Sequence, residues 1–291
     1  MREQAGKSVH LVRWGGFAAR FASRHETAHV LAQFERSWHI AADGEIICIV
    51  APDLGNGPLN AVVDAAGAEL LSRAAPCVGA TVRLGNAGQP AHDHFTLMTA
   101  NATDWSPPRA MPESIRAQAM PKAIARLQAL ARTHASQDGL ALIAFGCDGS
   151  DSPLDRVARP RLARLAEWLA GDRDMTPPTD LLGLGPGLTP SGDDVLCGVL
   201  VALHAVGRSA DTRALGTSIA AVAPALTSPL SCAYLAAAAE GQAAESLHLA
   251  VNAVLAGDLQ QLPRLVIEVG RHGHTSGWDA LAGAVMVLKS V

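Results

Sequence analysis

A segment of twelve residues, Gly183–Asp194, concentrates the residue types that can bind an anion. It reads GLGPGLTPSGDD, with two hydroxyl side chains immediately before two adjacent carboxylates. Glycines let backbone N–H groups approach a ligand closely, and the two prolines stiffen the loop. Apolar residues then recur at helical spacing over residues 195–206, so the loop leads into a helix N-terminus. Free amides and the helix dipole at such an end favour a bound anion.

The residues of this loop have different expected roles in anion binding. We expect backbone amides around Gly185 and Gly187 to hold the anion, and Gly192 to permit its close approach. The hydroxyls of Thr189 and Ser191 would add side-chain donors. Fixed donors of this kind stabilise negative charge that develops on a reacting carbonyl oxygen.

A purely structural explanation of the same loop stays open. Ser191 and Asp194 have the spacing of a capping box, in which the serine is the N-cap of the following helix. A cap leaves the upstream glycines, Thr189 and Asp193 unexplained. The loop is neither a Walker A motif nor a dinucleotide fingerprint, because no Gly-Lys-Ser/Thr follows and Pro190 takes the place of the third glycine.

A second copy of this pattern lies near the C-terminus. Residues 276–283 match residues 191–198 in the pattern SGxDxLxG, and each copy opens a helix of small residues. Gly198 and Gly283 inside these helices each cost about 1 kcal/mol relative to alanine, which close helix packing would explain. Ser276 is therefore a second candidate anion donor. His274, just before it, is a candidate donor or general acid–base, or a loop histidine bonded to backbone.

Metal binding has two weaker candidate sites. Asp193 and Asp194 have the oxygen ligands that suit Mg²⁺, although a helix N-terminus also accepts such carboxylates without a metal. The pairs His92-Asp-His94 and His272-Gly-His274 share a spacing, but no third ligand follows at a fixed distance. The sequence contains no recognisable arrangement of a nucleophile with its activating base. Asp193, Asp194 and His274 are thus the candidate catalytic residues, and Mg²⁺ is the candidate cofactor.

These motifs resemble those of the AllH family. The resemblance rests on Gly183–Asp194 with the helix that follows, and on Gly273–Gly283. An N-terminal block, Gly55–Asn60, and a further block, Ser231–Gly241, resemble other parts of the family pattern. Together the blocks run over nearly the whole chain.

The resemblance implies a subunit of oxamate carbamoyltransferase, which cleaves oxalurate with phosphate to oxamate and carbamoyl phosphate in allantoin breakdown. It implies FdrA-like and other subunits as partners, in addition to a homo-oligomer, and it adds Asn56 and Gly57 to the anion-binding residues. Two other functions stay open. One is a non-catalytic subunit that binds a regulatory anion and docks a catalytic partner. The other is a metal-dependent hydrolase or carboxylase of a small carboxylate.

The composition indicates a compact globular protein. Of its 291 residues 49% are hydrophobic and only 17% are charged, and the net charge of −4 argues against nucleic-acid or anionic-membrane partners. The five cysteines are scattered and form no Cys-x-x-Cys pair, which favours reduced thiols in the cytoplasm. No apolar run is long enough to cross a bilayer. We therefore expect a cytoplasmic protein.

The elements that must position these residues change in character along the chain. Alternating or continuous apolar runs predict strands within residues 9–99, including a hairpin at Asp43-Gly44, and another strand at Leu140–Phe145. Helical periods predict helices over residues 111–134, broken at Pro121, and 153–169. After residue 195 nearly every segment reads as an alanine-rich helix. We expect an α+β fold, with a β-rich region over residues 1–175 and a helical region over residues 176–291.

Overall fold

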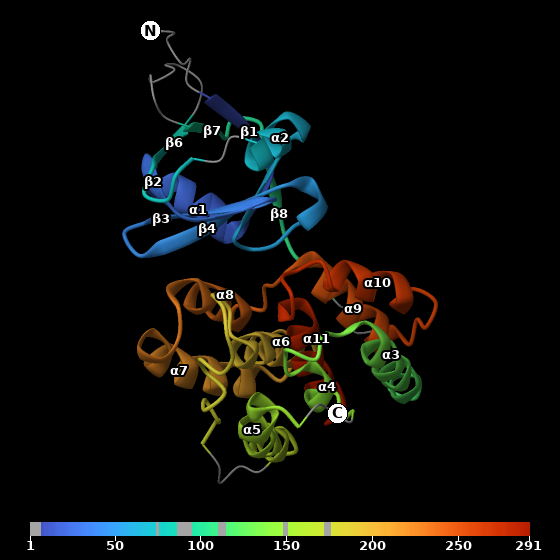
Figure 1. Cartoon of the computed structure of the whole chain (residues 1–291). Helices are drawn as coiled ribbons and strands as arrows, with labels where there is room; N and C mark the ends of the chain where they lie inside the picture. Colours follow the sequence, from blue (N-terminus) through green and yellow to red (C-terminus); the bar gives the residue numbers. More distant parts are fainter. Residues whose placement is uncertain (1–6, 74–75, 86–94, 110–114, 148–150, 172–175) are drawn as a thin grey trace, which may run out of the picture. The chain divides into compact units, whose positions relative to one another are not determined.

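A computed structural model gives the fold of the chain (Figure 1). It describes residues 7–73, 76–85, 95–109, 115–147, 151–171 and 176–291. The chain divides into two compact units, residues 1–107 and 108–291. Strands fill the first unit and helices the second, as an α+β fold requires. The division differs from the boundary expected at residues 175/176, because the helices between residues 120 and 169 share one hydrophobic core with the C-terminal helices.

The first unit is a closed sheet. Its described strands are β1 (Lys7–Gly15), β2 (Thr27–Phe34), β3 (Ser37–Ala42), β4 (Glu45–Val50), β5 (Asn60–Val63), β6 (Thr81–Gly85), β7 (Phe95–Met98) and β8 (Thr103–Trp105). They follow the order β5-β4-β3-β2-β6-β7-β1-β8, and an additional β5–β1 pairing closes the ring into a barrel. The predicted hairpin is confirmed: Ala42 pairs with Glu45, and both turn residues have positive φ, as a type I′ turn requires.

Two helices pack against this barrel, α1 (Gly16–Arg24) and α2 (Ala65–Arg73). A 3₁₀ turn, Pro52–Leu54, follows β4. Phe21 and Leu71 from the helices join strand residues such as Trp38 and Leu97 in the buried core. Burial of these apolar side chains stabilises the first unit, at about 25 cal/mol for each Å² removed from water.

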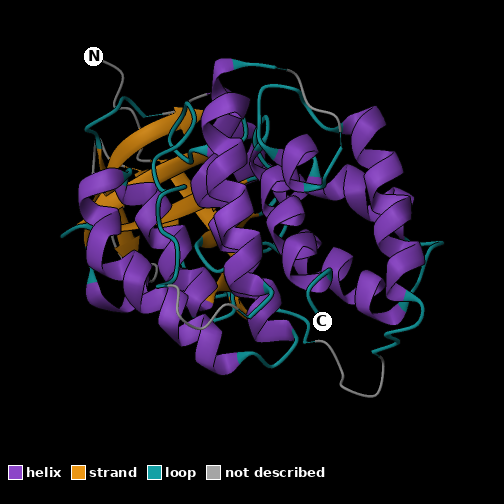
Figure 2. Ribbon diagram, turned by 90° about the horizontal axis from the view of Figure 1, so that it is seen from below, coloured by secondary structure: helices purple, strands orange, loops and turns teal. Residues whose placement is uncertain are grey.

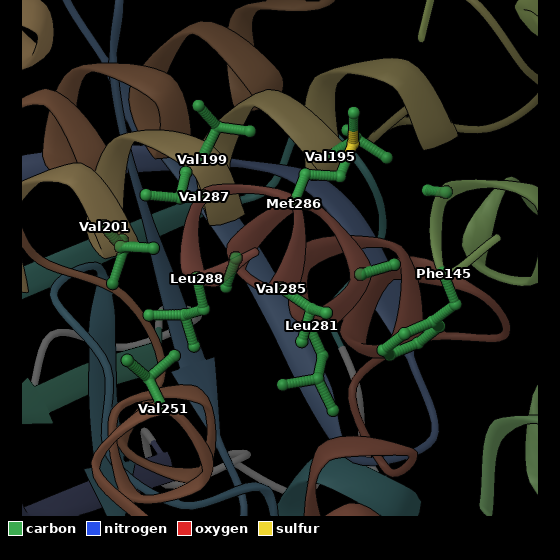
Figure 3. Close-up of a cluster of buried hydrophobic side chains, with 14 of the residues drawn as sticks. Phe145, Val195, Val199, Val201, Val251, Leu281, Val285, Met286, Val287 and Leu288 are labelled. Atoms are coloured by element: carbon green, nitrogen blue, oxygen red, sulfur yellow. The ribbon is translucent and has the colours of Figure 1, made fainter. Parts of the chain in front are cut away.

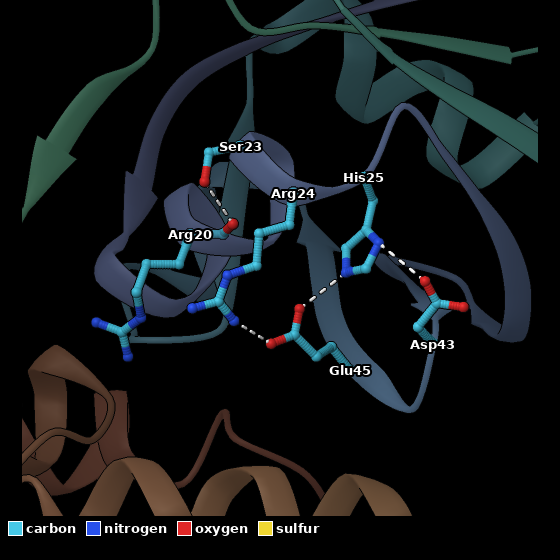
Figure 4. Close-up of polar contacts among 6 residues, drawn as sticks. All are labelled: Arg20, Ser23, Arg24, His25, Asp43 and Glu45. Carbon is cyan, nitrogen blue, oxygen red and sulfur yellow. Dashed lines mark hydrogen bonds and ion pairs between the residues drawn. The ribbon is translucent and has the colours of Figure 1, made fainter.

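A polar cluster ties the end of α1 to the β3–β4 hairpin (Figure 4). The His25 ring is nearly buried, and its Nε2 lies 2.8 Å from Glu45 Oε2 while Nδ1 lies 3.6 Å from Asp43 Oδ2. Arg24 donates to the second oxygen of Glu45 at 2.6 Å. The hydrogen bond from His25 is the main cause that lowers the pKa of Glu45. The cluster therefore fixes the helix end to the turn.

The second unit consists of helices and connecting loops (Figure 2). Its described helices are α3 (Met120–His134), α4 (Ala141–Ala144), α5 (Pro153–Leu169), α6 (Ser191–Ala205), α7 (Ser209–Leu226), α8 (Pro229–Ala239), α9 (Glu245–Ala256), α10 (Leu262–Val269) and α11 (Ser276–Leu288). The helices predicted after residue 195 are confirmed. None of the helices in the described ranges is long and apolar enough to cross a membrane. All five cysteines are free thiols.

Helices α6 and α11 form the centre of this unit. Their apolar side chains, among them Val195, Val199, Leu281 and Val285, are fully buried together (Figure 3). A Cβ on Gly198 would lie 1.8 Å from the Ala280 carbonyl oxygen, and a Cβ on Gly283 would lie 2.0 Å from that of Val195. The interior glycines thus serve close helix packing, as expected.

Two sequence-based predictions, in the segments that form α3 and α4, were wrong. The strand predicted at Leu140–Phe145 is wrong, since Ala141–Ala144 forms the short helix α4 inside the helical core. A short apolar run does not by itself distinguish a buried strand from a buried helix. Helix α3 begins at Met120, so Pro121 lies in its first turn, where a missing N–H is tolerated, instead of breaking a longer helix.

Candidate functional site

The N-termini of α6 and α11 lie side by side. Their C-terminal ends also meet, because Arg208, just after α6, donates from Nη1 to Oγ of Ser290, just after α11, at 2.9 Å, so the two helices are parallel. At their N-terminal ends the hydroxyls of Thr189 and Ser276 lie 2.9 Å apart. Two helix dipoles therefore point their positive ends at one place.

The capping box considered for Ser191 and Asp194 does not form, and the same spacing at Ser276 and Asp279 forms none either. Helix α6 begins at Ser191 itself, after Pro190, and α11 begins at Ser276, after Thr275; neither N-cap side chain accepts a hydrogen bond from its helix. The hydroxyls instead face the other motif, with Ser191 Oγ 3.4 Å from Thr275 Oγ1. Four hydroxyls thus gather where the two helices begin.

Several backbone amides at this place donate to nothing. Within the described part of the chain, the N–H groups of Gly185, Gly187, Ser191 and Ser276 make no hydrogen bond. Gly185 and Gly187 have positive φ, and the space beside Gly187 is open. Gly192 has a packing role, because a Cβ there would lie 2.0 Å from the Leu181 carbonyl oxygen.

Asp193 holds the Gly-rich loop in place. Its side chain is fully buried and accepts hydrogen bonds from the Gly183 N–H at 2.7 Å, from Ser231 Oγ at 2.6 Å and from the Thr227 hydroxyl. These bonds join the loop to the start of α8. The sequence signal for this contact, the Thr-Ser-Pro start of a helix, was visible, but nothing in it named Asp193 as the acceptor.

Asp194 is a buried acid without a full set of partners. Its side chain is 8% exposed, and Oδ2 has no hydrogen-bond partner among the described residues. Burial raises the pKa of Asp194 well above its usual value, and the charge of Asp279 raises it further. The hydroxyls of Ser276 and Thr189 act in the opposite direction. Burial and the charge of Asp279 both favour the protonated, neutral form of Asp194.

Asp279, the equivalent carboxylate on α11, was not singled out as a functional residue from the sequence. It is fully buried, and Oδ1 accepts the Leu140 N–H at 2.8 Å. Gly139 makes this possible, since a Cβ there would lie 2.7 Å from Asp279 Oδ2. Burial raises the pKa of Asp279 to about 6, partly offset by Ser191 and Thr275. The repeated SGxD pattern was the signal that could have found it.

Comparison with known proteins finds a family similar to the C-terminal part of the chain. The model of the family described as oxamate carbamoyltransferase subunit AllH matches residues 181–288. Residues 181–288 are therefore similar to the AllH family. No curated protein and no solved structure matches the chain. The match covers both SGxD motifs, so the resemblance is confirmed there, and the N-terminal block at Gly55–Asn60 lies outside it.

His274 in the AllH region lies in an exposed polar group. Its Nε2 is 2.8 Å from Asp138 Oδ2 and 3.1 Å from Ser136 Oγ. The three residue types are those of a catalytic triad, but a triad needs the two partners on different ring nitrogens. Here both contact Nε2, so the histidine has no relay geometry. The hydrogen bond from His274 is the main cause that lowers the pKa of Asp138.

The N-terminal block has a structural role in the first unit. The Pro58 carbonyl accepts hydrogen bonds from the N–H groups of Phe17 and Ala18, both at 3.1 Å, and so caps α1. A Cβ on Gly15 would lie 2.1 Å from the Gly57 carbonyl oxygen. Asn56 is buried. Anion binding by Asn56 and Gly57 stays a prediction.

Metal ligands do not gather in the described part of the AllH region or of the first unit. No group of three His, Cys, Asp or Glu side chains there is arranged to hold a metal ion. Asp193 uses its oxygens on Gly183, Thr227 and Ser231, whereas Asp194 lies toward Ser276. The pair His92-Asp-His94 lies outside the described residues. A Mg²⁺ ion at Asp193 and Asp194 stays a prediction.

Proposed function

We propose that this chain is an AllH-type subunit of a carbamoyltransferase that binds its anionic ligand at the paired N-termini of α6 and α11. The ligand is phosphate, carbamoyl phosphate or an oxamate-like carboxylate. The family match names such a subunit, and a subunit name implies partner chains in a carbamoyltransferase complex. The observation that carries the proposal is the convergence of two helix N-termini with unused amides and four hydroxyls.

The electrostatics of the buried acids support an anion at this place. An ionised carboxylate would repel it, but burial and the nearby Asp279 raise the pKa of Asp194 and so favour its protonated form. A neutral acid is itself a hydrogen-bond donor. The oxygens of Asp193 are already engaged by three donors, the Gly183 N–H and the hydroxyls of Thr227 and Ser231. The amides of Gly185, Gly187 and Ser191 are then free to hold the anion.

The reaction proposed for the complex is the phosphorolysis of oxalurate or a related ureido compound. A phosphate oxygen forms a bond to the carbamoyl carbon, and the bond from that carbon to the oxamate nitrogen breaks. The nitrogen takes up one proton and the attacking hydrogen phosphate loses one, so the protons balance. We assign the Asp194 carboxyl as the group that gives its proton to the leaving nitrogen and regains one from phosphate. The hydroxyls of Ser191 and Ser276 would donate to the carbamoyl oxygen.

A thermal-shift series on the purified chain tests this proposal. Phosphate, carbamoyl phosphate and oxamate are each tested with and without Mg²⁺. A ligand present at 100 times its dissociation constant adds about 2.7 kcal/mol of stability and so raises the melting temperature. We expect Ser191→Ala and Ser276→Ala to weaken this shift. Ser209→Ala is the matched control, because Ser209 also opens a helix, α7, but is exposed and outside the site.

The outcomes separate the proposal from its alternatives. No shift with any anion, or an equal shift in all three serine variants, refutes binding at the paired N-termini. A shift without carbamoyl transfer, even when an FdrA-like partner is added, identifies a non-catalytic anion-binding subunit. A shift that appears only with Mg²⁺ and accompanies hydrolysis favours the metal-dependent hydrolase.

A further inference from the structure

A pocket of about 490 Å³ opens on the second unit where α3 ends and α11 begins. Residues from α3, α10 and α11 and from the adjoining loops line it, including His134, Ser136, Ile267, Arg271, His274 and Trp278. Most of the polar groups on its wall are hydrogen-bond donors. Such a lining suits a ligand that carries acceptors and negative charge.

The strongest indication of a ligand is the indole N–H of Trp278. The side chain is 4% exposed and packs edge-on against Phe145, with ring centroids 6.3 Å apart, so its position is fixed. Its Nε1 makes no hydrogen bond among the described residues and is not one of the fully buried unpartnered atoms, so its N–H is open to the pocket that Trp278 lines. Nε1 lies 3.1 Å from where a Cβ on the pocket residue Gly270 would be, so the absence of that Cβ leaves room beside the N–H. A nearly buried indole usually has an acceptor.

Arg271 supplies the charge. Its guanidinium forms no ion pair within the described residues, in contrast to Arg264 on the same helix-and-loop segment, which pairs with Glu268 at 3.0 Å. No carboxylate is among the described residues that line the pocket, and Asp138, which contacts its wall, is engaged by His274 and Ser136. Guanidinium groups bind carboxylates through two parallel hydrogen bonds.

We propose that this pocket binds a small organic carboxylate at a site separate from the paired helix N-termini. Trp278 is two residues after Ser276, which places it about 200° around the helix, on the opposite face. The carboxylate would accept from Arg271 and from the Trp278 indole, and its carbon chain would contact Val266 and Ile267. These aliphatic side chains in the pocket wall favour an organic carboxylate over inorganic phosphate, because only the organic ligand has apolar surface to bury against them.

The indole signals of the protein in a ¹H–¹⁵N NMR spectrum test this site directly. The chain has five tryptophans, and Trp278→Phe identifies the signal of Trp278 by its disappearance. Propionate and oxamate are the probes, and propionamide is a neutral molecule of nearly the same shape as propionate. We expect both carboxylates, but not propionamide, to shift the Trp278 signal in a saturable way. Arg271→Gln should weaken this binding at least about tenfold, whereas Arg264→Gln should leave it unchanged.

Three results overturn the inference. One is an unmoved Trp278 signal, and another is equal affinity in Arg271→Gln and the native protein. The third is an equal shift with phosphate, which would remove the preference for an organic ligand. Ser191→Ala distinguishes this site from the proposed anion site: we expect unchanged propionate binding in that variant, and a matching loss would show that the two sites are one.

Discussion

Replacing Gly198 by alanine tests whether the close pairing of α6 and α11 holds the second unit together. Helix propensity alone predicts that alanine stabilises α6 by about 1 kcal/mol. The new Cβ would lie 1.8 Å from the Ala280 carbonyl oxygen and 2.9 Å from the Ala284 nitrogen. A carbon and a carbonyl oxygen normally stay at least about 3.3 Å apart, so the helices would have to separate by about 1.5 Å.

The loss of stability can be estimated from the backbone atoms that the new Cβ would meet. Overpacked side chains typically cost about 1–3 kcal/mol, and the upper end applies here because a backbone atom has no rotamer to change. After the gain in helix propensity, Gly198→Ala should destabilise the second unit by at least about 2 kcal/mol. For a unit of this size that lowers the melting temperature by about 4–8 °C.

Urea unfolding followed by far-UV circular dichroism measures this change, because the helical unit dominates that signal. Gly216→Ala is the matched control: Gly216 is inside α7, and a Cβ there would meet side-chain atoms and no backbone, Ala239 at 3.2 Å and Leu200 at 4.0 Å. Gly283→Ala should cost as much as Gly198→Ala, and the double variant should cost less than their sum, because separating the helices once relieves both clashes. A Gly198→Ala protein as stable as the native one refutes the reasoning.

Three further predictions concern buried polar groups. Burial lowers the pKa of His248 to about 4, and its Nε2 accepts the Ala243 N–H at 3.0 Å. The neutral histidine therefore contributes about 3 kcal/mol of stability above pH 6.5, and this contribution should be lost as the pH falls toward 4. An acid titration in which His248→Gln unfolds at the same pH as the native protein contradicts this. The pKa of Asp279 is raised to about 6, so its contribution to stability is complete below pH 3.8 and is lost as the pH rises to 6. Asp279→Asn should therefore stabilise the protein above pH 6 by up to about 3 kcal/mol. Urea unfolding at two pH values measures this difference. Ser231→Ala removes a donor to the fully buried Asp193 and should cost about 1.5–3 kcal/mol in urea unfolding, while Ser209→Ala should cost less than about 0.5 kcal/mol.

Local patterns predicted the parts of the fold that depend on neighbours in sequence. The Asp43-Gly44 hairpin and the helices after residue 195 follow from turn chemistry and from apolar period. The repeat of SGxDxLxG also indicated two similar helix N-termini and a reason for Gly198 and Gly283. The repeat does not predict that the two helices pack side by side in parallel, which is the contact that brings their N-terminal residues together.

The sequence-based predictions that were wrong concern residues whose structure is decided by contacts with distant parts of the chain. Ser191 and Ser276 fit a capping box by spacing, but each faces the opposite motif, so only the tertiary structure separates a cap from a contact between helices. Leu140–Phe145 is apolar because it lies in the helical core beside Asp279, and its helical conformation is fixed by that environment. Barrel closure likewise depends on β1 pairing with β5, which is remote in sequence.

The parallel arrangement explains why the site contains acids that an anion would avoid if they were ionised. Equivalent positions of two parallel helices bring equivalent carboxylates together, so the charge of Asp279 adds to burial in raising the pKa of Asp194. Asp279→Asn removes that charge and should therefore lower the pKa of Asp194 at the same time as it stabilises the fold. If the neutral Asp194 is the proton donor, carbamoyl transfer by this variant should decline at a lower pH than in the native complex. A stabilised variant with an unchanged pH profile would leave Asp194 a structural acid and separate the stability of the helix pair from its chemistry.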